Sequence, residues 1–587
     1  MTKGNENSNE EAAKNREEKL LELVKEDIKS TETARSRMRT RVEELDRMWK
    51  GERTRKTYVG RSNVVIPFPY WYAESMIPRL MASIFGGRDI VEVLPRGNGT
   101  LLGARAHKAL INYQLLFEME AFVKLLHFCQ SVIRKQMGVA KIRWDAQKRA
   151  PQWHNINVED FASDPSAPVL SEKRWMGHVV TKTKEELARG VIERGYDPEA
   201  VEAIIAKNPE TMVGSGIDRV EVSKERGTYR LWEWWGDFAM DADGSQPLIV
   251  LMGEDKLVKW IKSPYKGLKP FIAVQDVVDP RQFEGHSEMK PIEGLWNITS
   301  DLLNQRVDNV SLGINRLWTI LRGANVRRDK LISVPWGVID VDAHEDIKDW
   351  APKDVTNQAY GEVSQLMGIM KDTTGLIDQL RGVDKPSSDT ATAFQGIVAQ
   401  ANLRPGLKVQ VMQYMGIMRM AQIMIAENRM FLDANKAILI VGEANAAKAA
   451  MDVSPEMIQG EYDVLPLGVA LAGSRDMRIG QLINGLNVLR GYEQQGLNIF
   501  PIVREMVGLL EVRNGEQVTA GWEKRLEEQE AMQQRAMRMQ ELVQAGVLPS
   551  PQPAGAPMGM PGQVNMPGVP PMGMQTPAGG AVGGPLR

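Results

Sequence analysis

The chain has 587 residues, of which 43% are hydrophobic, so it can bury a large core and hold several domains of ordinary size. Lysine and arginine (73) nearly balance aspartate and glutamate (75), which leaves a net charge of −2. This balance excludes a protein whose main task is tight binding of nucleic acid, because such binding needs an excess of clustered cations. A single cysteine, Cys129, excludes disulfides within one chain, and we predict that it is a buried apolar residue in a protein made in a reducing compartment.

Hydropathy gives no sign of a membrane protein. The sequence contains no apolar run approaching the roughly 18 residues that span a bilayer. The residues after Met1 are polar and lack the apolar centre of a signal peptide. We therefore expect neither a membrane span nor a secretory leader.

The first half of the chain is predicted to combine helices with strands. Residues 1–13 are polar, and we expect them to be disordered. Residues 14–284 hold amphipathic helical stretches and then alternating, strand-like segments, among them Val139–Asp145 and Tyr229–Trp235. The expected fold class is therefore α+β, with helix predominating.

Two long helices separated by a short mixed segment form the most distinctive pattern. Apolar residues recur at helical spacing through residues 285–321 and again through 357–381. At 1.5 Å per residue, helices from Ser287 to Leu321 and from Asn357 to Arg381 would be roughly 50 Å and roughly 36 Å long. We predict an antiparallel pair whose polar sides are only half covered, and a helical hairpin inside an ordinary core is the alternative. The residues expected to pack within the pair are Leu295, Leu302, Val310, Leu317, Tyr360, Met367, Met370 and Ile377.

Residues 322–356, between these helices, contain short extended pieces and segregated charges. Cations gather at the start of the segment and carboxylates near its end. This segregation favours a surface that docks a partner or a neighbouring copy, and ordinary solvated charge is the alternative. The residues concerned are Arg322, Arg327, Arg328, Lys330, Asp340, Asp342, Glu345 and Asp346.

The last third of the chain begins with a loop and ends in a low-complexity tail. Residues 382–389 are rich in residues that break regular structure. Residues 390–470 predict a long methionine-rich helix followed by extended segments, and residues 471–545 predict further helices. Residues 546–587, rich in Met, Pro and Gly, are expected to be disordered.

Motifs of catalysis are absent from the sequence. There is no G-x-x-x-x-G-K-[ST] loop to hold phosphates, no pair of histidines one helical turn apart to hold zinc, and no G-x-S-x-G elbow for a serine nucleophile. Asp241 and Asp243 could bind a cation, but Asp-Ala-Asp-Gly is more typical of a turn. We expect no catalytic residues, no metal and no cofactor.

The order of the parts resembles the portal proteins of tailed bacteriophages, particularly the larger podovirus-like portals. The resemblance covers about residues 20–545. It rests on the order of a helix, a compact module and a second helix within Gly285–Arg381. The supporting motifs are Arg61–Pro67, which leads into the helix of Met76–Leu80; Gly138–Asp145; Val158–Phe161, which is followed by Asp164-Pro165; and Gly460–Val464.

This resemblance implies a ring of about a dozen copies at one capsid vertex, around a channel through which double-stranded DNA enters during packaging and leaves during ejection. Residues 14–284 and 390–470 would form the wing, 285–321 and 357–381 the stem helices, 322–356 the clip, 382–389 the tunnel loop and 471–545 crown-like helices. The residues expected at the channel are Arg381, Asp384, Lys385, Ser387 and Ser388.

The resemblance also implies a set of partners and a location. The clip would dock the large terminase subunit and later the head-completion or tail proteins, and the ring would contact major capsid and scaffolding proteins. The protein would be made in the host cytoplasm and reside in the virion. Two other classes stay open: a terminase-like or nuclease-like enzyme, and a capsid scaffolding protein, against which the strands of residues 139–262 weigh.

Overall fold

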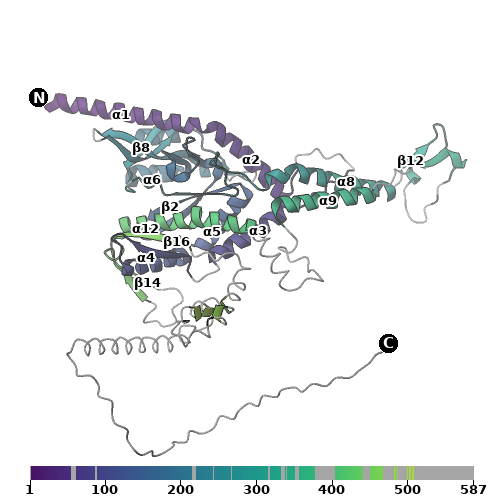
Figure 1. Cartoon of the computed structure of the whole chain (residues 1–587). Helices are drawn as coiled ribbons and strands as arrows, with labels where there is room; N and C mark the ends of the chain where they lie inside the picture. The colour runs from purple at the N-terminus through teal and green to yellow at the C-terminus, as the bar shows by residue number, and fades with distance from the viewer. Residues whose placement is uncertain are drawn as a thin grey trace, which may run out of the picture. The chain divides into compact units, whose positions relative to one another are not determined.

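The computed structural model describes residues 2–53, 61–85, 89–213, 220–241, 244–265, 267–314, 317–331, 338, 340–350, 356–376, 403–439, 450–466 and scattered positions between 482 and 507. The chain divides into two units, residues 1–497 and 498–587. Helices and strands alternate through the first unit (Figure 1), so the predicted mixed fold is confirmed.

Two helices open the chain, α1 (Thr2–Ser30) and α2 (Glu32–Lys50). The helical backbone of α1 begins within residues 1–13, so the prediction of disorder there is wrong. Glutamate, lysine and alanine favour helix, and a helix docked further along the chain can extend over a polar stretch at little cost. The docked part is marked by Leu20, Val24 and Ile28, which are all buried.

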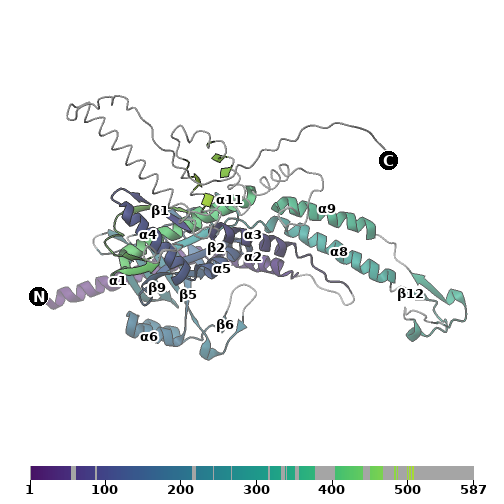
Figure 2. The same cartoon turned by 90° about the horizontal axis from the view of Figure 1, so that it is seen from below.

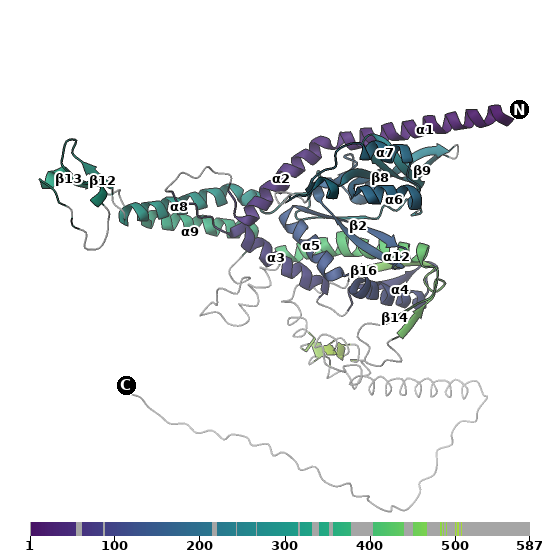
Figure 3. The same ribbon diagram turned by 180° about the vertical axis from the view of Figure 1, so that it is seen from behind.

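A five-stranded antiparallel sheet lies under α1. Its strands are ordered β10-β9-β8-β5-β4. Trp234 of β8 is 1% exposed and packs with Leu20 and Val24 of α1, while Leu231 of the same strand packs with helices on the opposite face. Figure 3 shows α1 running along this sheet. The bounds are β4 Phe161–Ser163, β5 Met176–Lys182, β8 Tyr229–Asp241, β9 Gly244–Gly253 and β10 Lys256–Lys262, with α6 Lys184–Arg194 and α7 Pro198–Ile205 on the far face.

A three-stranded sheet, ordered β11-β2-β3, supports the largest core cluster. The central strand β2 begins at Met137–Gly138, and a Cβ at Gly138 would lie 2.7 Å from Val132, so only glycine allows helix α5 to approach this closely. Figure 2 shows these strands among the surrounding helices. The bounds are β2 Met137–Asp145, β3 Ala150–Ile156, β11 Phe271–Gln275, α3 Phe68–Phe85, α4 Leu101–Tyr113, α5 Ala121–Arg134, α11 Leu403–Val411 and α12 Arg419–Phe431.

Short strand pairs join distant parts of the chain. β1 (Val91–Arg96) pairs antiparallel with β16 (Glu461–Pro466), and β14 (Lys436–Leu439) pairs with β15 (Ala450–Val453). A second link is a reciprocal amide pair, in which Gln114 and Asn428 each donate to the other at 2.8 and 2.9 Å. Residues more than 300 positions apart in sequence therefore share one core.

The single cysteine lies in the core, and the helices are mixed in polarity. Cys129 is fully buried, as predicted, and burial raises the pKa of its thiol to about 12. Of the helices that the structure describes, not one combines the length and the apolar character needed to cross a bilayer.

Polar contacts fix α1 to the sheet in addition to its apolar face. The indole Nε1 of Trp234 donates to Asp27 Oδ2 at 3.0 Å, and that of Trp260 donates to Glu17 Oε1 at 2.9 Å. Burial raises the pKa of Asp27 from its ordinary 3.8 to about 6, although the hydrogen bond from Trp234 opposes this shift. The folded state therefore holds the Asp27 proton more tightly than the unfolded chain does.

This shift predicts a pH-dependent effect of Asp27→Asn. Because the pKa is raised on folding, the contribution of the protonated carboxyl to stability is present below about pH 4 and is lost as the pH rises through about 6. Asparagine keeps an acceptor for Trp234 but cannot ionise. We expect the melting temperature of the variant to exceed that of wild type near neutral pH, and this difference to become smaller toward about pH 4. Thermal unfolding at several pH values measures the difference. A difference in melting temperature that does not change with pH would contradict this assignment.

Candidate functional site

The two predicted long helices lie side by side as α8 (Glu293–Ile314) and α9 (Thr356–Thr374). Figures 1 and 2 both show them paired, and the chain leaves α8 and returns through α9, so the pair is antiparallel. Where α8 ends and α9 begins, β12 (Leu317–Ile320) pairs antiparallel with β13 (Ile347–Trp350). The structure therefore has a helix pair that carries a small strand pair at one end.

Both helices are shorter than predicted, for identifiable reasons. The helix does not begin at residue 285, because Gly285 has φ +61° and His286 pairs with Val277 in a backbone bridge. It ends before residue 321, because Leu317–Ile320, rich in residues that favour strands, pairs with β13 instead. The second helix ends at Thr374, not at Arg381, since Gly375 adopts φ +66°, a left-handed conformation that terminates helices.

The residues predicted to pack between the two helices differ in how deeply they are buried, and the difference follows their position along the pair. Met370 is fully buried, and Leu295 and Met367 are half-buried against the largest core cluster. Leu302 is half-buried as well. By contrast, Val310 is 43% exposed in the single chain, and Tyr360 is 64% exposed although Arg306 of α8 lies over its ring, with Cζ 5.4 Å from the ring centre.

Leu317 lies on strand β12 and not on the helix, and Ile377 lies outside the described residues. One face of the base is thus embedded in the core, although Ile298 and Ile369 there are 53% and 42% exposed, and the distal part exposes apolar side chains as well. The exposed apolar residues of that distal part are Val310, Leu312, Ile314 and Tyr360.

An extended segment covers the polar side of α8. From the sequence, we expected this side to be only half covered. Asn304 accepts from Val64 N at 2.6 Å and donates to Val64 O at 2.8 Å, so one side chain pairs with a backbone as a neighbouring strand would. Asp308 accepts from Ser62 N at 2.8 Å, and Trp296 Nε1 donates to Ile66 O at 2.7 Å. On the same side of α8, Arg53 Nη2 donates to Asp301 Oδ1 at 2.6 Å. The run Arg61–Ile66 is therefore held by side chains of α8 that satisfy its backbone.

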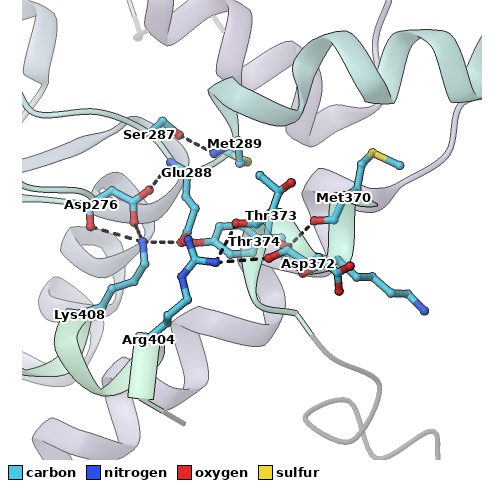
Figure 4. A network of polar contacts seen from close by, with 12 residues as sticks. Asp276, Ser287, Glu288, Met289, Met370, Asp372, Thr373, Thr374, Arg404 and Lys408 are labelled. Atoms are coloured by element: carbon cyan, nitrogen blue, oxygen red, sulfur yellow. Dashed lines mark hydrogen bonds and ion pairs between the residues drawn. The ribbon is translucent and has the colours of Figure 1, made fainter. Parts of the chain in front are cut away.

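A buried charge cluster fixes the base of the helix pair. Lys408 of α11 forms ion pairs with Asp276, which follows β11, and with Glu288, which precedes α8, the second at 2.8 Å (Figure 4). The hydroxyl of Tyr72 on α3 donates to Glu288, and the backbone N–H of Glu288 donates to Asp276 Oδ2 at 2.8 Å. Asp276, Glu288 and Lys408 are all nearly buried, with side-chain exposures of 0%, 9% and 11%.

The two carboxylates favour the charged form of Lys408. Burial alone would lower the pKa of Lys408, but the charges of Asp276 and Glu288 outweigh it and hold the pKa above its ordinary value. Burial, together with the same two carboxylates, raises the pKa of Tyr72 well above normal, so its hydroxyl stays a donor. The cluster thus joins α3, α8 and α11 through ionic hydrogen bonds.

Arg404 extends the cluster to the end of α9. Its Nη1 donates to the backbone oxygens of Thr373 at 2.9 Å and Asp372 at 3.4 Å, and its Nη2 lies 3.2 Å from Glu288 Oε1 (Figure 4). The carbonyls at a helix C-terminus lack partners within the helix, and a cation there also favours the helix dipole. Arg404 therefore caps α9 and ties its end to the residue that precedes α8.

Sequence reasoning missed this cluster because its members come from four separate segments. The one local signal is the carboxylate of Asp276 directly after Phe271–Gln275, a fully buried strand. A charge at the end of a buried strand indicates a partner, but the sequence does not say which residue supplies it.

The charged residues predicted between the helices lie around the β12–β13 pair. Those whose side chains the structure describes are Arg322, Arg327, Arg328, Asp340, Asp342 and Glu345, all exposed, and Asp346, which is half-buried and accepts from Ala343 N at 3.1 Å. Lys330 lies in a short 3-10 turn, Arg328–Lys330. The residues predicted at the channel, Arg381, Asp384, Lys385, Ser387 and Ser388, lie outside the described residues.

In the described part of the chain, His, Cys, Asp and Glu side chains do not gather as metal ligands do. No group of three or more His, Cys, Asp or Glu side chains there could hold a metal ion. Burial lowers the pKa of His107 and His178 to about 4, so both rings are neutral near pH 7. His107 Nε2 lies 2.9 Å from Ile458 O and donates to it, which indicates a structural role.

The charge cluster predicts a large loss of stability for Lys408→Met. Methionine nearly matches the volume of lysine but leaves Asp276 and Glu288 buried beside each other without their cation. We expect the free energy of unfolding to fall by about 3–5 kcal/mol. Arg404→Met is the matched control, because Arg404 is 57% exposed, and should cost less than about 1 kcal/mol. Denaturant unfolding compares the two, and equal losses would refute the special role of Lys408.

The contact between α8 and the extended segment predicts that Asn304→Leu is destabilising. Leucine fits the space but leaves the N–H and the carbonyl of Val64 without hydrogen-bond partners. We expect this loss to lower the free energy of unfolding by about 1–3 kcal/mol. Gln305→Leu, one residue along and exposed, should change stability by less than about 0.5 kcal/mol. Hydrogen exchange at Val64 is a second readout: it should accelerate only in Asn304→Leu, and unchanged protection would count against the pairing.

Comparison with known proteins places this architecture in a family. The family model described as phage SU10 portal protein matches residues 20–151 and 146–545. A search among curated proteins gives no match. The match covers most of the chain and confirms the resemblance seen in the sequence. The chain therefore belongs to the phage SU10 portal protein family, whose members are portal proteins of tailed phages.

Proposed function

We propose that this chain assembles into a ring at one capsid vertex and that the ring forms the channel through which double-stranded DNA enters and leaves the capsid. The observation that carries the proposal is the antiparallel pair α8–α9, anchored at its base and bearing a strand pair at its other end. Together with membership of a portal family, this arrangement fits a stem with a clip.

The proposed parts follow the observed boundaries. The stem consists of α8 (Glu293–Ile314) and α9 (Thr356–Thr374), and the clip centres on the strand pair β12–β13 within residues 317–350. The sheets and helices of residues 14–284, with residues 403–466, form the wing. Residues 382–389 as a tunnel loop and 471–545 as a crown complete the proposal.

Exposed apolar side chains on the distal stem support assembly. Val310, Leu312, Ile314 and Tyr360 are between 37% and 69% exposed on one helix pair. Burying them against the stem of a neighbouring copy would remove apolar surface from water, at about 25 cal/mol per Å². A closed ring makes such contacts around the whole circle, because each copy presents two different faces to its neighbours.

The charge of the chain also suits a channel. A net charge of −2 over 587 residues offers no large cationic field to hold DNA in place. Residues Arg381 and Lys385, repeated around a ring, would give weak and evenly spaced contacts that let a duplex slide. In this proposal the protein is structural, and a separate packaging enzyme supplies the work.

The exposed charges of the clip are proposed to dock partners. Arg322, Arg327 and Arg328 precede the carboxylates Asp340, Asp342 and Glu345 in sequence, and both sets lie in the chain segment that joins β12 to β13. Complementary charge on a partner would speed and orient docking. We assign this surface to the large terminase subunit during packaging and to head-completion or tail proteins afterwards.

Assembly can be tested with a variant that changes only the exposed stem. The purified wild type should form rings with a central hole in negative-stain electron micrographs. Ile314→Asp should lose the rings but keep the melting temperature of the isolated chain, because Ile314 is 69% exposed. Ile192→Asp on α6, where the residue is 87% exposed, is the control and should still form rings. Monomeric wild type, or rings from Ile314→Asp as abundant as from wild type, would overturn the proposal.

A further inference from the structure

Two neighbours flank α8 from opposite directions. Arg306 lies over the Tyr360 ring of α9, whereas Asn304 accepts from Val64 N and donates to Val64 O. Residues two positions apart in an α-helix point about 160° away from each other around its axis. α9 and the segment Arg61–Ile66 therefore lie on opposite flanks of α8, and two further sides of the helix lie between them.

One of these two sides, called side A, carries Val310 and Ile314 of α8 and Tyr360 of α9. Val310 and Ile314 are one helical turn apart and are 43% and 69% exposed. Arg306 lies one turn before Val310 and thus on the same side of the helix, and its contact with Tyr360 places that ring there as well. Trp296, at the start of the same stripe, is 2% exposed. Side A is therefore buried at the base of the stem and open in the distal part.

The opposite side, called side B, carries Ile298 and Leu312 of α8 and Ile369 of α9. Leu312 lies two residues from both Val310 and Ile314, so its side chain points about 160° away from theirs. Ile298 precedes Leu312 by nearly four whole turns, so the two side chains point within about 40° of each other. Ile298 is 53% exposed and Leu312 is 37% exposed. Side B is therefore open at the base as well as in the distal part.

Ile369 is assigned to side B by the antiparallel register of the two helices. The contact of Arg306 with Tyr360 sets the level at which α8 and α9 meet. Counted from that contact toward the base, Ile298 lies eight residues away on α8 and Ile369 nine residues away on α9, so both lie near the same level. That interval on α9 makes two and a half turns, so Ile369 points away from Tyr360, and it is 42% exposed.

Sides A and B differ in their residues and in their position along the stem. An isologous dimer needs one patch that complements itself, whereas a closed ring needs two different patches on every copy. Membership of the portal family implies a ring oligomer. A second copy of this chain is therefore the partner that accounts for both apolar sides at once.

We propose that side A of one copy packs against side B of the next copy around the ring. This pairing rests on the proposed ring and adds to it which surfaces meet: Val310 and Ile314 of one stem lie against Leu312 of the neighbouring stem. Helices that expose narrow apolar stripes bury them by packing side chains of one into the grooves of the other. Each copy then uses side A toward one neighbour and side B toward the other, so a closed ring leaves neither side exposed.

Engineered cysteines test this pairing in the full chain. In Val310→Cys/Leu312→Cys, the two thiols point to opposite sides of one helix and cannot bond within a copy. Mild oxidation of the assembled rings should therefore link neighbouring copies and give a ladder of multimers on a non-reducing gel. Val310→Cys/Ile314→Cys, with both thiols on side A, is the matched control and should give no ladder. Wild type should give none either, because Cys129 is fully buried.

The outcomes separate this pairing from the ring itself. Negative-stain micrographs of each variant establish first whether rings form, and wild type without rings would contradict the proposed function. Rings of Val310→Cys/Leu312→Cys that give no ladder, or a ladder from Val310→Cys/Ile314→Cys, would overturn the pairing of sides A and B and leave the ring standing. Ile314→Cys/Leu312→Cys also joins side A to side B, and the same criteria apply to it if the first variant does not assemble.

Discussion

The buried ion cluster of Lys408 with Asp276 and Glu288 is the constraint on which the rest of the stem depends. Charges this deeply buried are tolerable only when each has its partner, so the three segments that carry them must meet at one point. Arg404, four residues before Lys408, extends the same point to the end of α9. The cluster therefore fixes both helices of the pair at their base, while their distal parts project beyond the largest core cluster with apolar side chains exposed.

A second constraint is the backbone of Arg61–Ile66, which pairs with none of the strands that the structure describes. Side chains of α8 take the place of a neighbouring strand, and Asn304 alone satisfies one donor and one acceptor of Val64. This arrangement explains why α8 carries amides and carboxylates on a side that faces protein. In the proposed ring, the exposed apolar residues from Val310 to Ile314 would be available to a neighbouring copy, because this polar side is already occupied.

Much of this architecture could be predicted from periodicity. The spacing of Leu295, Leu302 and their neighbours marks two helices, and the break between them marks an inserted module, because both patterns are local in sequence. The predicted helix ends were wrong at Leu317, which pairs in β12, and at Gly375, whose positive φ ends α9. The cluster around Lys408 could not be predicted, since partners such as Asp276 and Lys408 lie 132 residues apart and nothing local selects one carboxylate for one cation.

The most direct measurement of the central claim is a three-dimensional reconstruction, by electron cryomicroscopy, of the assembled wild-type protein at a resolution that traces helices. The account predicts that α8 and α9 of every copy line the central hole, with β12–β13 at one mouth and the Lys408 cluster at the base of each helix pair. An assembly in which α8 and α9 lie on the outer rim, or are separated from each other, would contradict it.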